Sequence, residues 1–364
     1  TIQQVVLTVE NGEQLSGVMD TTLILTPDRL WLVNSSFRIG INGHLIIKAG
    51  TQIILKNPII NRGLVTATGT KDSLVLINGP QSFGGNGSYN FKYCRFSGIY
   101  KTLGAPTQDF SSMGNYSYSN CLFENIYVDN YNMDNAVLIY AKSLVVKESI
   151  IKSCSAIYGF FENTSGYIFE KNNIINSYLC SMVVGYFKNP SITSFSSFKY
   201  NNFSNINIGT LYANYSRGDA LFSLDGNTNL SQSFNNIIGF NKDREFIITT
   251  GSNEIANIKN QYWGSTDINK IKNSSFDFWQ DPSKPQTDYN PFLSTPSDSC
   301  HAITWKLLVN GKDPQDEFVD AIGVGKHRFD VYFNREMDTT YTPQLSFGVR
   351  YPYTQQPVAD SGRW

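Results

Sequence analysis

The stretch YNNFSNI, residues 200–206, decides the fold because close variants of it return along the chain. Four variants are YCRFSGI at 93–99, NCLFENI at 120–126, ESIIKSC at 148–154 and KNNIINS at 171–177. We take the large apolar residue of each unit as a core anchor, and the anchors recur at steps of 27, 28, 23, 29, 35 and 25 residues. The predicted anchors are Phe96, Phe123, Ile151, Ile174, Phe203, Ile238 and Trp263. Periods in this range are typical of solenoids.

A second column, two residues before each anchor, holds small or amide side chains. Asn tolerates the left-handed backbone conformation of a tight bend, and stacked amides hydrogen-bond from coil to coil. We therefore predict a structural ladder along this column, with stacked thiols favoured over a disulfide at its two cysteines. Its predicted members are Cys94, Cys121, Ser149, Asn172, Asn201, Asn236 and Gln261.

The apolar segments within each repeat are short and alternate with polar residues, as in SYNFKY at 88–93 and SFSSFK at 194–199. This alternation is the period of a β-strand, whereas a helical repeat needs apolar residues at i, i+3, i+4 and i+7. Short strands joined by tight bends, with coils about 4.8 Å apart, describe a parallel β-helix. The predicted fold class is all-β.

We predict two regions. Residues 1–295 form the β-helix, with leading coils from about residue 20 and a capping segment, about 264–295, that covers the open edge of the last coil. Residues 300–364 alternate like antiparallel strands but fall short of the ~100 residues of a β-sandwich. The chain opens at Thr1 without Met or a basic-then-apolar leader, so we expect a processed or truncated piece of a longer polypeptide.

Composition excludes several functions. A net charge of -1, from 29 basic and 30 acidic residues, supplies no global field for nucleic acid or an anionic membrane. No apolar run approaches the ~18–20 residues that span a bilayer, so we expect no membrane insertion. The five cysteines have no CxxC spacing and no nearby His, which argues against zinc and favours buried free thiols. We expect no metal and no cofactor.

Residues 41–77 resemble the opening coils of right-handed parallel β-helix (pectate-lyase-like) domains in secreted and surface proteins of Bacteroidota-type bacteria. Ala49-Gly50-Thr51 stands where these domains have Pro-Gly-Thr, and NQYWGSTD at 260–267 resembles their closing N-x-W-G coil. Residues 329–340, FDVYFNREMDTT, are similar to bacterial Ig-like modules. The resemblance implies a right-handed β-helix followed by a partial Ig-like β-sandwich. Because this fold hosts lyases, hydrolases and non-catalytic adhesins, it does not choose an activity.

A lyase would need a carboxylate cluster and a cationic base, and a hydrolase would need two carboxylates ~5–9.5 Å apart. The candidates are Asp134 and Glu162, each eleven residues after an anchor and so near each other on adjacent coils. Counted back from the next apolar column they fall out of register. Solvated loop acids are therefore the simpler interpretation, and catalysis is the less favoured hypothesis.

Tyrosines in loops, beside Asn and Asp, suit stacking on sugar rings. The Arg-Gly-Asp tripeptide at 217–219 can bind integrins when it lies on an exposed loop tip, but a given tripeptide also occurs often by chance. The candidate ligand-binding residues are Asp129, Tyr131, Tyr158, Tyr215, Arg217 and Asp219. We predict a secreted or surface-exposed bacterial module with a binding or structural, adhesin-like role, whose partner is a polysaccharide or a component of the cell surface or secretion machinery. The alternative is a polysaccharide lyase or glycoside hydrolase acting in the groove of the coils.

Overall fold

The chain divides into two units, Thr1–His301 and Ala302–Trp364, which are described separately. The computed structural model describes residues 11–99, 103–104, 114–126, 143–154, 158–159, 167–179, 181–183, 197–208, 222–224, 232–240, 247–249, 255–273, 275–279, 281–283, 286–314, 318–319, 323, 325–340, 344–346 and 355–357.

The first unit is a parallel β-helix, as the repeat predicts. One coil runs through β3 (Thr22–Leu25), β4 (Leu30–Val33) and β5 (Phe37–Ile39), and the next through β6 (His44–Lys48), β7 (Gln52–Leu55) and β8 (Ile59–Asn61). Each strand pairs in parallel with its counterpart one coil later: β3 with β6, β4 with β7 and β5 with β8. Stacked coils therefore build long parallel sheets.

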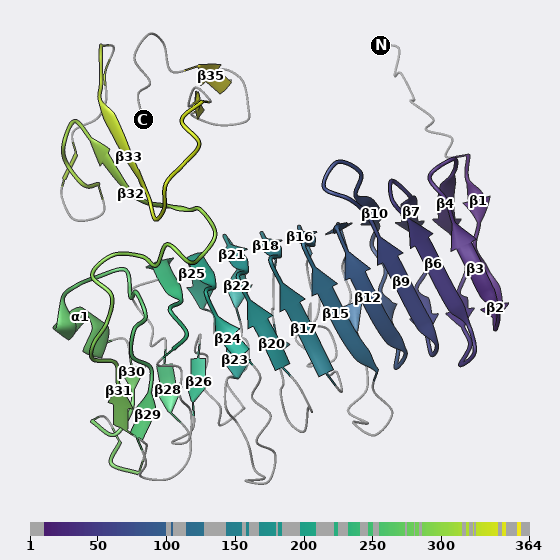
Figure 1. Cartoon of the computed structure of the whole chain (residues 1–364), viewed down its shortest axis with the longest axis horizontal. Helices are drawn as coiled ribbons and strands as arrows, with labels where there is room; N and C mark the ends of the chain where they lie inside the picture. The colour runs from purple at the N-terminus through teal and green to yellow at the C-terminus, as the bar shows by residue number, and fades with distance from the viewer. Residues whose placement is uncertain are drawn as a thin grey trace, which may run out of the picture. The chain divides into compact units, whose positions relative to one another are not determined.

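We name the sheets A, B and C, and Figure 1 shows sheet C as a row of parallel arrows. Sheet C continues from β3 and β6 through β9 (Leu64–Thr68), β12 (Ser88–Lys92), β15 (Asn115–Ser119), β17 (Ser143–Lys147), β20 (Tyr167–Glu170) and β24 (Ser197–Lys199). Sheet A runs from β1 (Glu13–Gln14) through β4, β7, β10 (Val75–Asn78), β13 (Cys94–Ser97), β16 (Leu122–Glu124), β18 (Ile150–Lys152), β21 (Asn173–Ile175) and β25 (Asn202–Ile208) to β27 (Asn236–Phe240), and β22 (Tyr178–Leu179) also pairs with β25.

Sheet B contains β2 (Gly17–Met19), β5, β8, β11 (Phe83–Gly84) and β14 (Leu103–Gly104). A further parallel sheet contains β19 (Tyr158–Gly159), β23 (Ser181–Val183), β26 (Phe222–Leu224), β28 (Ile247–Thr249) and β30 (Ser275–Phe276).

The core is a set of stacked columns, because the same inward position recurs in every coil. Phe96 stacks on Phe123 with ring centroids 5.1 Å apart, and Phe91 stacks on Tyr118 at 5.4 Å. Phe169 stacks on Phe198 at 5.5 Å. All seven predicted anchors are buried.

One coil is shifted by a residue from the predicted register. Phe203 pairs with Ile237, and the backbone of Asn201 donates to the side chain of Asn235. Ile237 and Asn235 are therefore the anchor and ladder members of this coil, and Ile238 and Asn236 lie one position further along. The local sequence NNII contains two amides and two isoleucines in succession, so it satisfies both registers equally well.

The amide ladder forms where the sequence supplies amides. The Oδ1 of Asn201 accepts from the backbone N–H of Asn172 at 2.9 Å and from its Nδ2 at 3.1 Å. Asn235 accepts from the N–H of Asn201 at 2.9 Å, and Gln261 accepts from the N–H of Asn235 at 2.9 Å. Each buried bend is thus hydrogen-bonded by the side chain of the next coil, which satisfies groups turned away from water.

The left-handed conformation falls one residue before the ladder, which corrects the predicted reason for its Asn content. The residues with positive φ at this bend are Tyr93, Asn120, Glu148, Lys171, Tyr200, Phe234 and Asn260, with φ between 48° and 60°. The ladder Asn residues are therefore explained by their hydrogen bonds. A second bend, two residues after the anchor, is left-handed at Gly98, Asn125, Ser153, Asn176 and Asn205.

The end of the first unit lies on the last coil. Helix α1 (Ile268–Lys272) is capped by Asp267, whose side chain accepts from the backbone N–H of Asn269, and the helix buries Ile271. Strand β31 (Gln286–Asp288) pairs with β29 (Ile255–Asn257) in parallel. No helix among the described residues is long and apolar enough to cross a bilayer.

The second unit is also built from strands. Strands β32 (Thr304–Val309) and β33 (Phe329–Phe333) form an antiparallel pair, and so do β34 (Gln344–Ser346) and β35 (Gln355–Pro357). Antiparallel pairing agrees with the alternation in the sequence of this region.

Candidate functional site

The predicted catalytic and ligand-binding residues lie almost entirely outside the described part of the chain. Outside it are Asp129, Tyr131, Asp134, Glu162, Tyr215, Arg217 and Asp219. Tyr158 begins strand β19, but its side chain is not described. These residues stay predictions, and the candidate site in the described part of the chain is made of other residues.

That site is the outward face of sheet C. On β12 the rings of Tyr89 and Phe91 are buried in the core, whereas Asn90 and Lys92 are exposed. Because pairing is parallel and in register, outward residues of successive coils stand in straight rows. One row carries Thr66, Asn90 and Ser117 in consecutive coils. Eight described strands at about 4.8 Å give the face a length of about 34 Å.

A second row, which we call the lysine row, follows the last outward residue of each strand. Register pairing joins its members coil by coil along the sheet. In spatial order they are Lys48, Thr68, Lys92, Ser119, Lys147, Glu170 and Lys199. Lysine therefore occupies every second coil, and a non-lysine residue stands between each pair.

Aromatic rings flank the lysine row at the left-handed bend. The Nζ of Lys92 lies 5.7 Å from the ring centroid of Tyr93, and the Nζ of Lys199 lies 5.4 Å from that of Tyr200. Tyr200 stacks on Phe234 with centroids 6.1 Å apart. These rings are half-buried. The face thus combines hydroxyl and amide groups, ammonium groups and aromatic edges, which are the groups that bind sugars.

Glu170 is the one acid in the lysine row. Its Oε2 lies 3.2 Å from the Nζ of Lys147, and its Oε1 lies 3.6 Å from the Nζ of Lys199. Burial raises the pKa of Glu170, but a hydrogen bond from Ser197 and the two lysine charges outweigh this effect and lower the pKa below its ordinary 4.5. Glu170 is therefore ionised at neutral pH and holds two lysines of the row in place.

The outward face of sheet A differs, because part of it is covered by the chain itself. Asn173, Asn202 and Asn236 form an outer amide row, with bonds of 2.6 and 2.9 Å between neighbours. Asn202 also donates to the carbonyl of His301 at 3.0 Å, and Asn236 accepts from the N–H of Ser297 at 2.7 Å. The segment 297–301 covers this row, so the side-chain amides of Asn202 and Asn236 are already hydrogen-bonded within the chain.

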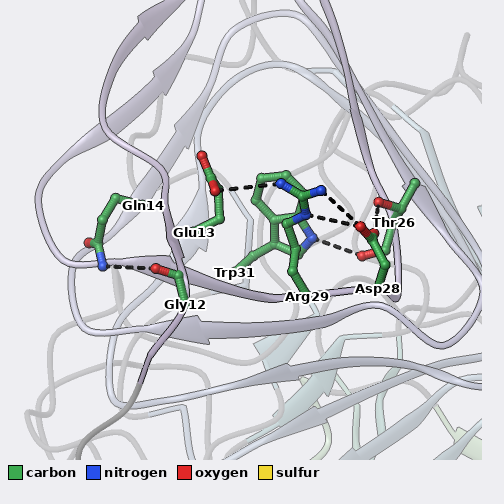
Figure 2. A network of polar contacts seen from close by, with 7 residues as sticks. All are labelled: Gly12, Glu13, Gln14, Thr26, Asp28, Arg29 and Trp31. Atoms are coloured by element: carbon green, nitrogen blue, oxygen red, sulfur yellow. Dashed lines mark hydrogen bonds and ion pairs between the residues drawn. The ribbon is translucent and has the colours of Figure 1, made fainter.

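The polar network in Figure 2 lies at the N-terminal coil. The guanidinium of Arg29 bonds to Asp28 at 2.8 and 3.1 Å, approaches Glu13 at 3.5 Å and lies 5.6 Å from the Trp31 ring centroid. Trp31 donates to the carbonyl of Thr26 at 2.9 Å. The side chains of this cluster bridge the bend between β3 and β4 and strand β1, so we assign it a structural role at the end of the solenoid.

No three His, Cys, Asp or Glu side chains cluster as a metal site in the described part of the chain. Comparisons with protein-family models, curated proteins and solved structures found no match. The chain is thus defined by its fold: it is a parallel β-helix followed by a small antiparallel β unit.

The lysine row has a signal in the sequence that column analysis could have found. Lys92, Ser119, Lys147, Glu170 and Lys199 each lie four residues before an anchor. The outward polar residues differ from coil to coil more than the apolar and bend columns do, because only those two columns define the fold.

Proposed function

We propose that this protein is a non-catalytic binding module of a secreted or surface-exposed bacterial polypeptide, and that it contacts extended carbohydrate along the outward face of sheet C. The β-helix supplies the scaffold in this proposal, and the second unit serves as a partial Ig-like module of a longer adhesin-like protein. The secreted or surface-exposed bacterial setting follows from the resemblance of residues 41–77 to β-helix domains of Bacteroidota-type surface proteins.

The observation that carries the proposal is the regular spacing of polar groups on sheet C. Hydroxyl and amide groups stand at Thr66, Asn90 and Ser117, one coil apart. The three groups span two coil steps, about 9.6 Å, on a face about 34 Å long, and the row continues as Ile46 before them and Val145 after them. A straight row of hydrogen-bonding groups on an open sheet matches an extended polymer better than a small molecule, which binds in a concave pocket. Aromatic edges at Tyr93 and Tyr200 supply apolar contact for sugar rings.

The test is a panel of soluble polysaccharides, measured by affinity electrophoresis and calorimetry. The double substitution Asn90→Ala with Ser117→Ala removes two hydrogen-bonding groups from the face. Each bond contributes about 0.5–1.5 kcal/mol, so we expect binding to weaken about tenfold.

The matched control is Ser97→Ala with Ser204→Ala, which removes two hydroxyls from the outward side of sheet A. This control should bind like the unmodified protein. Equal loss in both double variants, or no binding to any polysaccharide, would refute the proposal. Parallel recording of ultraviolet absorbance from unsaturated uronate products tests the lyase alternative, and product lost in Asp134→Ala or Glu162→Ala would establish an enzyme.

A further inference from the structure

We infer that the lysine row selects an acidic polysaccharide whose carboxylates recur on one side of the chain at every second sugar. This inference rests on the proposed carbohydrate contact and names its substrate class. The lysine row would recognise the spacing of negative charges on the polysaccharide, whereas the row of Thr66, Asn90 and Ser117 would form hydrogen bonds with its hydroxyl groups.

The spacing of the row carries the inference. Lys48, Lys92, Lys147 and Lys199 alternate with Thr68, Ser119 and Glu170 without an exception in the seven paired coils. Two coil steps separate successive lysines, which is about 9.6 Å. Since the scaffold is a continuous parallel sheet, this distance is fixed by backbone hydrogen bonds and does not depend on loop conformation.

The chemistry of extended polysaccharides matches this distance. In a flat β-1,4-linked chain consecutive sugars face opposite sides, so substituents on one side recur once per disaccharide. The length of an extended disaccharide is close to two coil steps. A carboxylate on that side would therefore meet an ammonium group at each repeat, and charge-assisted hydrogen bonds are stronger than neutral ones.

The balance of charge on the row favours an anion. Four lysines and one glutamate sum to +3 at neutral pH, although the whole chain carries -1. Lys48 and Lys92 are exposed on the face. Glu170 offsets part of the charge between Lys147 and Lys199, so the stronger contacts should fall at Lys48 and Lys92.

The residues of the left-handed bend, which follow the lysine row by one position, do not cancel its positive charge. Glu148 and Lys171 occupy successive bend positions and carry opposite charges, and Tyr93 and Tyr200 place aromatic rings beside the row. An acidic sugar can thus pair its carboxylate with lysine while its apolar carbons contact the edge of a tyrosine ring.

The experiment compares two hexasaccharides with the same backbone, β-1,4-linked hexamannuronate and neutral mannohexaose, by calorimetry with the full chain. We expect hexamannuronate to bind at least about tenfold more tightly, and rising salt should weaken it because exposed charges are screened. Lys92→Gln should lose about tenfold toward hexamannuronate and leave mannohexaose unchanged. Lys152→Gln, an exposed lysine on sheet A, is the matched control and should bind normally.

A transposition separates spacing from total charge. Lys92→Ser combined with Ser119→Lys keeps composition and net charge, but it breaks the alternation of the row. We expect it to lose as much affinity as Lys92→Gln, and far-ultraviolet circular dichroism and the melting temperature should confirm that it folds. A transposed variant that binds hexamannuronate like the unmodified protein would overturn the inference, because the total positive charge of the face would then account for binding without any regular spacing.

The failure of the inference differs from the failure of the proposed function. Equal binding of the two hexasaccharides, or binding of mannohexaose alone, would overturn charge selection and leave the carbohydrate contact standing. Absence of binding to both hexasaccharides, and to the wider polysaccharide panel, would overturn both.

Discussion

The structural ladder has a thiol half, which contains Cys94 and Cys121, and an amide half, which contains Asn172 and Asn201. The two halves hydrogen-bond to backbone carbonyls of the core with different chemical groups. In the thiol half, the Sγ of Cys94 donates to the carbonyl of Ala67 at 3.7 Å, and that of Cys121 donates to Phe91 at 3.6 Å. In the amide half, the Nδ2 of Asn201 donates to Phe169 at 2.9 Å. Both halves thus bond to a carbonyl of the same inward column, one coil earlier.

The amide has a second function that a thiol performs poorly. Its oxygen accepts the N–H of the bend in the preceding coil, as Asn201 does for Asn172 at 2.9 Å, whereas sulfur is only a weak acceptor. The coils of Cys94 and Cys121 compensate with aromatic packing, including the stack of Phe96 on Phe123. One solenoid column can therefore be stabilised mainly by packing in some coils and mainly by hydrogen bonds in others.

The largest expected effect comes from the packing of the thiol half. Phe123→Ala removes a fully buried ring that stacks on Phe96 and contacts Tyr118, and we expect the free energy of unfolding to fall by about 3–5 kcal/mol. Urea denaturation followed by circular dichroism measures it. Phe123→Leu is the control and should recover most of the loss, because it refills much of the volume. An alanine variant within 1 kcal/mol of the unmodified protein would contradict the packing account.

The next effect comes from the amide half. Asn201→Leu conserves size but leaves the N–H of Asn172 and the carbonyl of Phe169 without their side-chain partner. Each buried unsatisfied group costs about 1–3 kcal/mol, so we expect a loss of about 2–4 kcal/mol by the same denaturation measurement.

Asn205→Gly serves as the control for the amide half, because Asn205 is exposed and left-handed, a conformation that glycine tolerates, although it also bonds to an amide of the preceding coil. Its loss should stay well under that of Asn201→Leu. Similar losses at the two positions would mean that burial of the ladder does not set its contribution.

A smaller effect tests the thiols directly. Cys121→Ala removes one weak Sγ–H donor and little volume, and we expect a loss of about 1–2 kcal/mol. The matched substitution is Asn201→Ala, which should cost more because it removes a donor and an acceptor together. Melting temperatures of the two alanine variants measure the difference. A reversed order would contradict the comparison between the halves.

The smallest effect concerns Glu170 and pH. Because its pKa is lowered in the folded state, Glu170 stabilises the protein above its ordinary pKa of 4.5, and this stability is lost as pH falls through the folded value. Its lysine partners are substantially exposed, so Glu170→Gln should cost less than about 1 kcal/mol at pH 7. Denaturation at pH 7 and at pH 3 should show a difference only at pH 7. A difference that persists at pH 3 would point to packing in place of charge.

The sequence predicted the fold and the two main columns because both follow from local periodicity. Phe96, Phe123 and Phe203 recur at one position of each coil, and a solenoid buries that position in every turn. The four described cysteines are buried thiols, as expected. Burial raises the pKa of the Cys154 and Cys300 thiols to about 12, which keeps both in the protonated form that donates hydrogen bonds.

The register of single coils and the outward rows depended on the tertiary structure. The sequence NNII around Ile237 fits two registers, and only pairing of β27 with β25 selects one. Lys48, Lys92 and Lys147 lie far apart in the chain at unequal steps, because the connections between strands differ in length. Lys48 and Thr68 precede the first anchor, Phe96, so only the stacking of the coils in register places them in the same row as Lys92 and Lys147.

The repeating pattern of core anchors and ladder positions was therefore determined by the sequence itself, since alternation within a strand follows from backbone geometry. Stacking of the coils selects which bend residue is left-handed and which amide of the NNII coil joins the ladder, and it extends the lysine row to Lys48. These properties depend on hydrogen bonds between coils, and those bonds join residues that lie 17 or more positions apart in the chain.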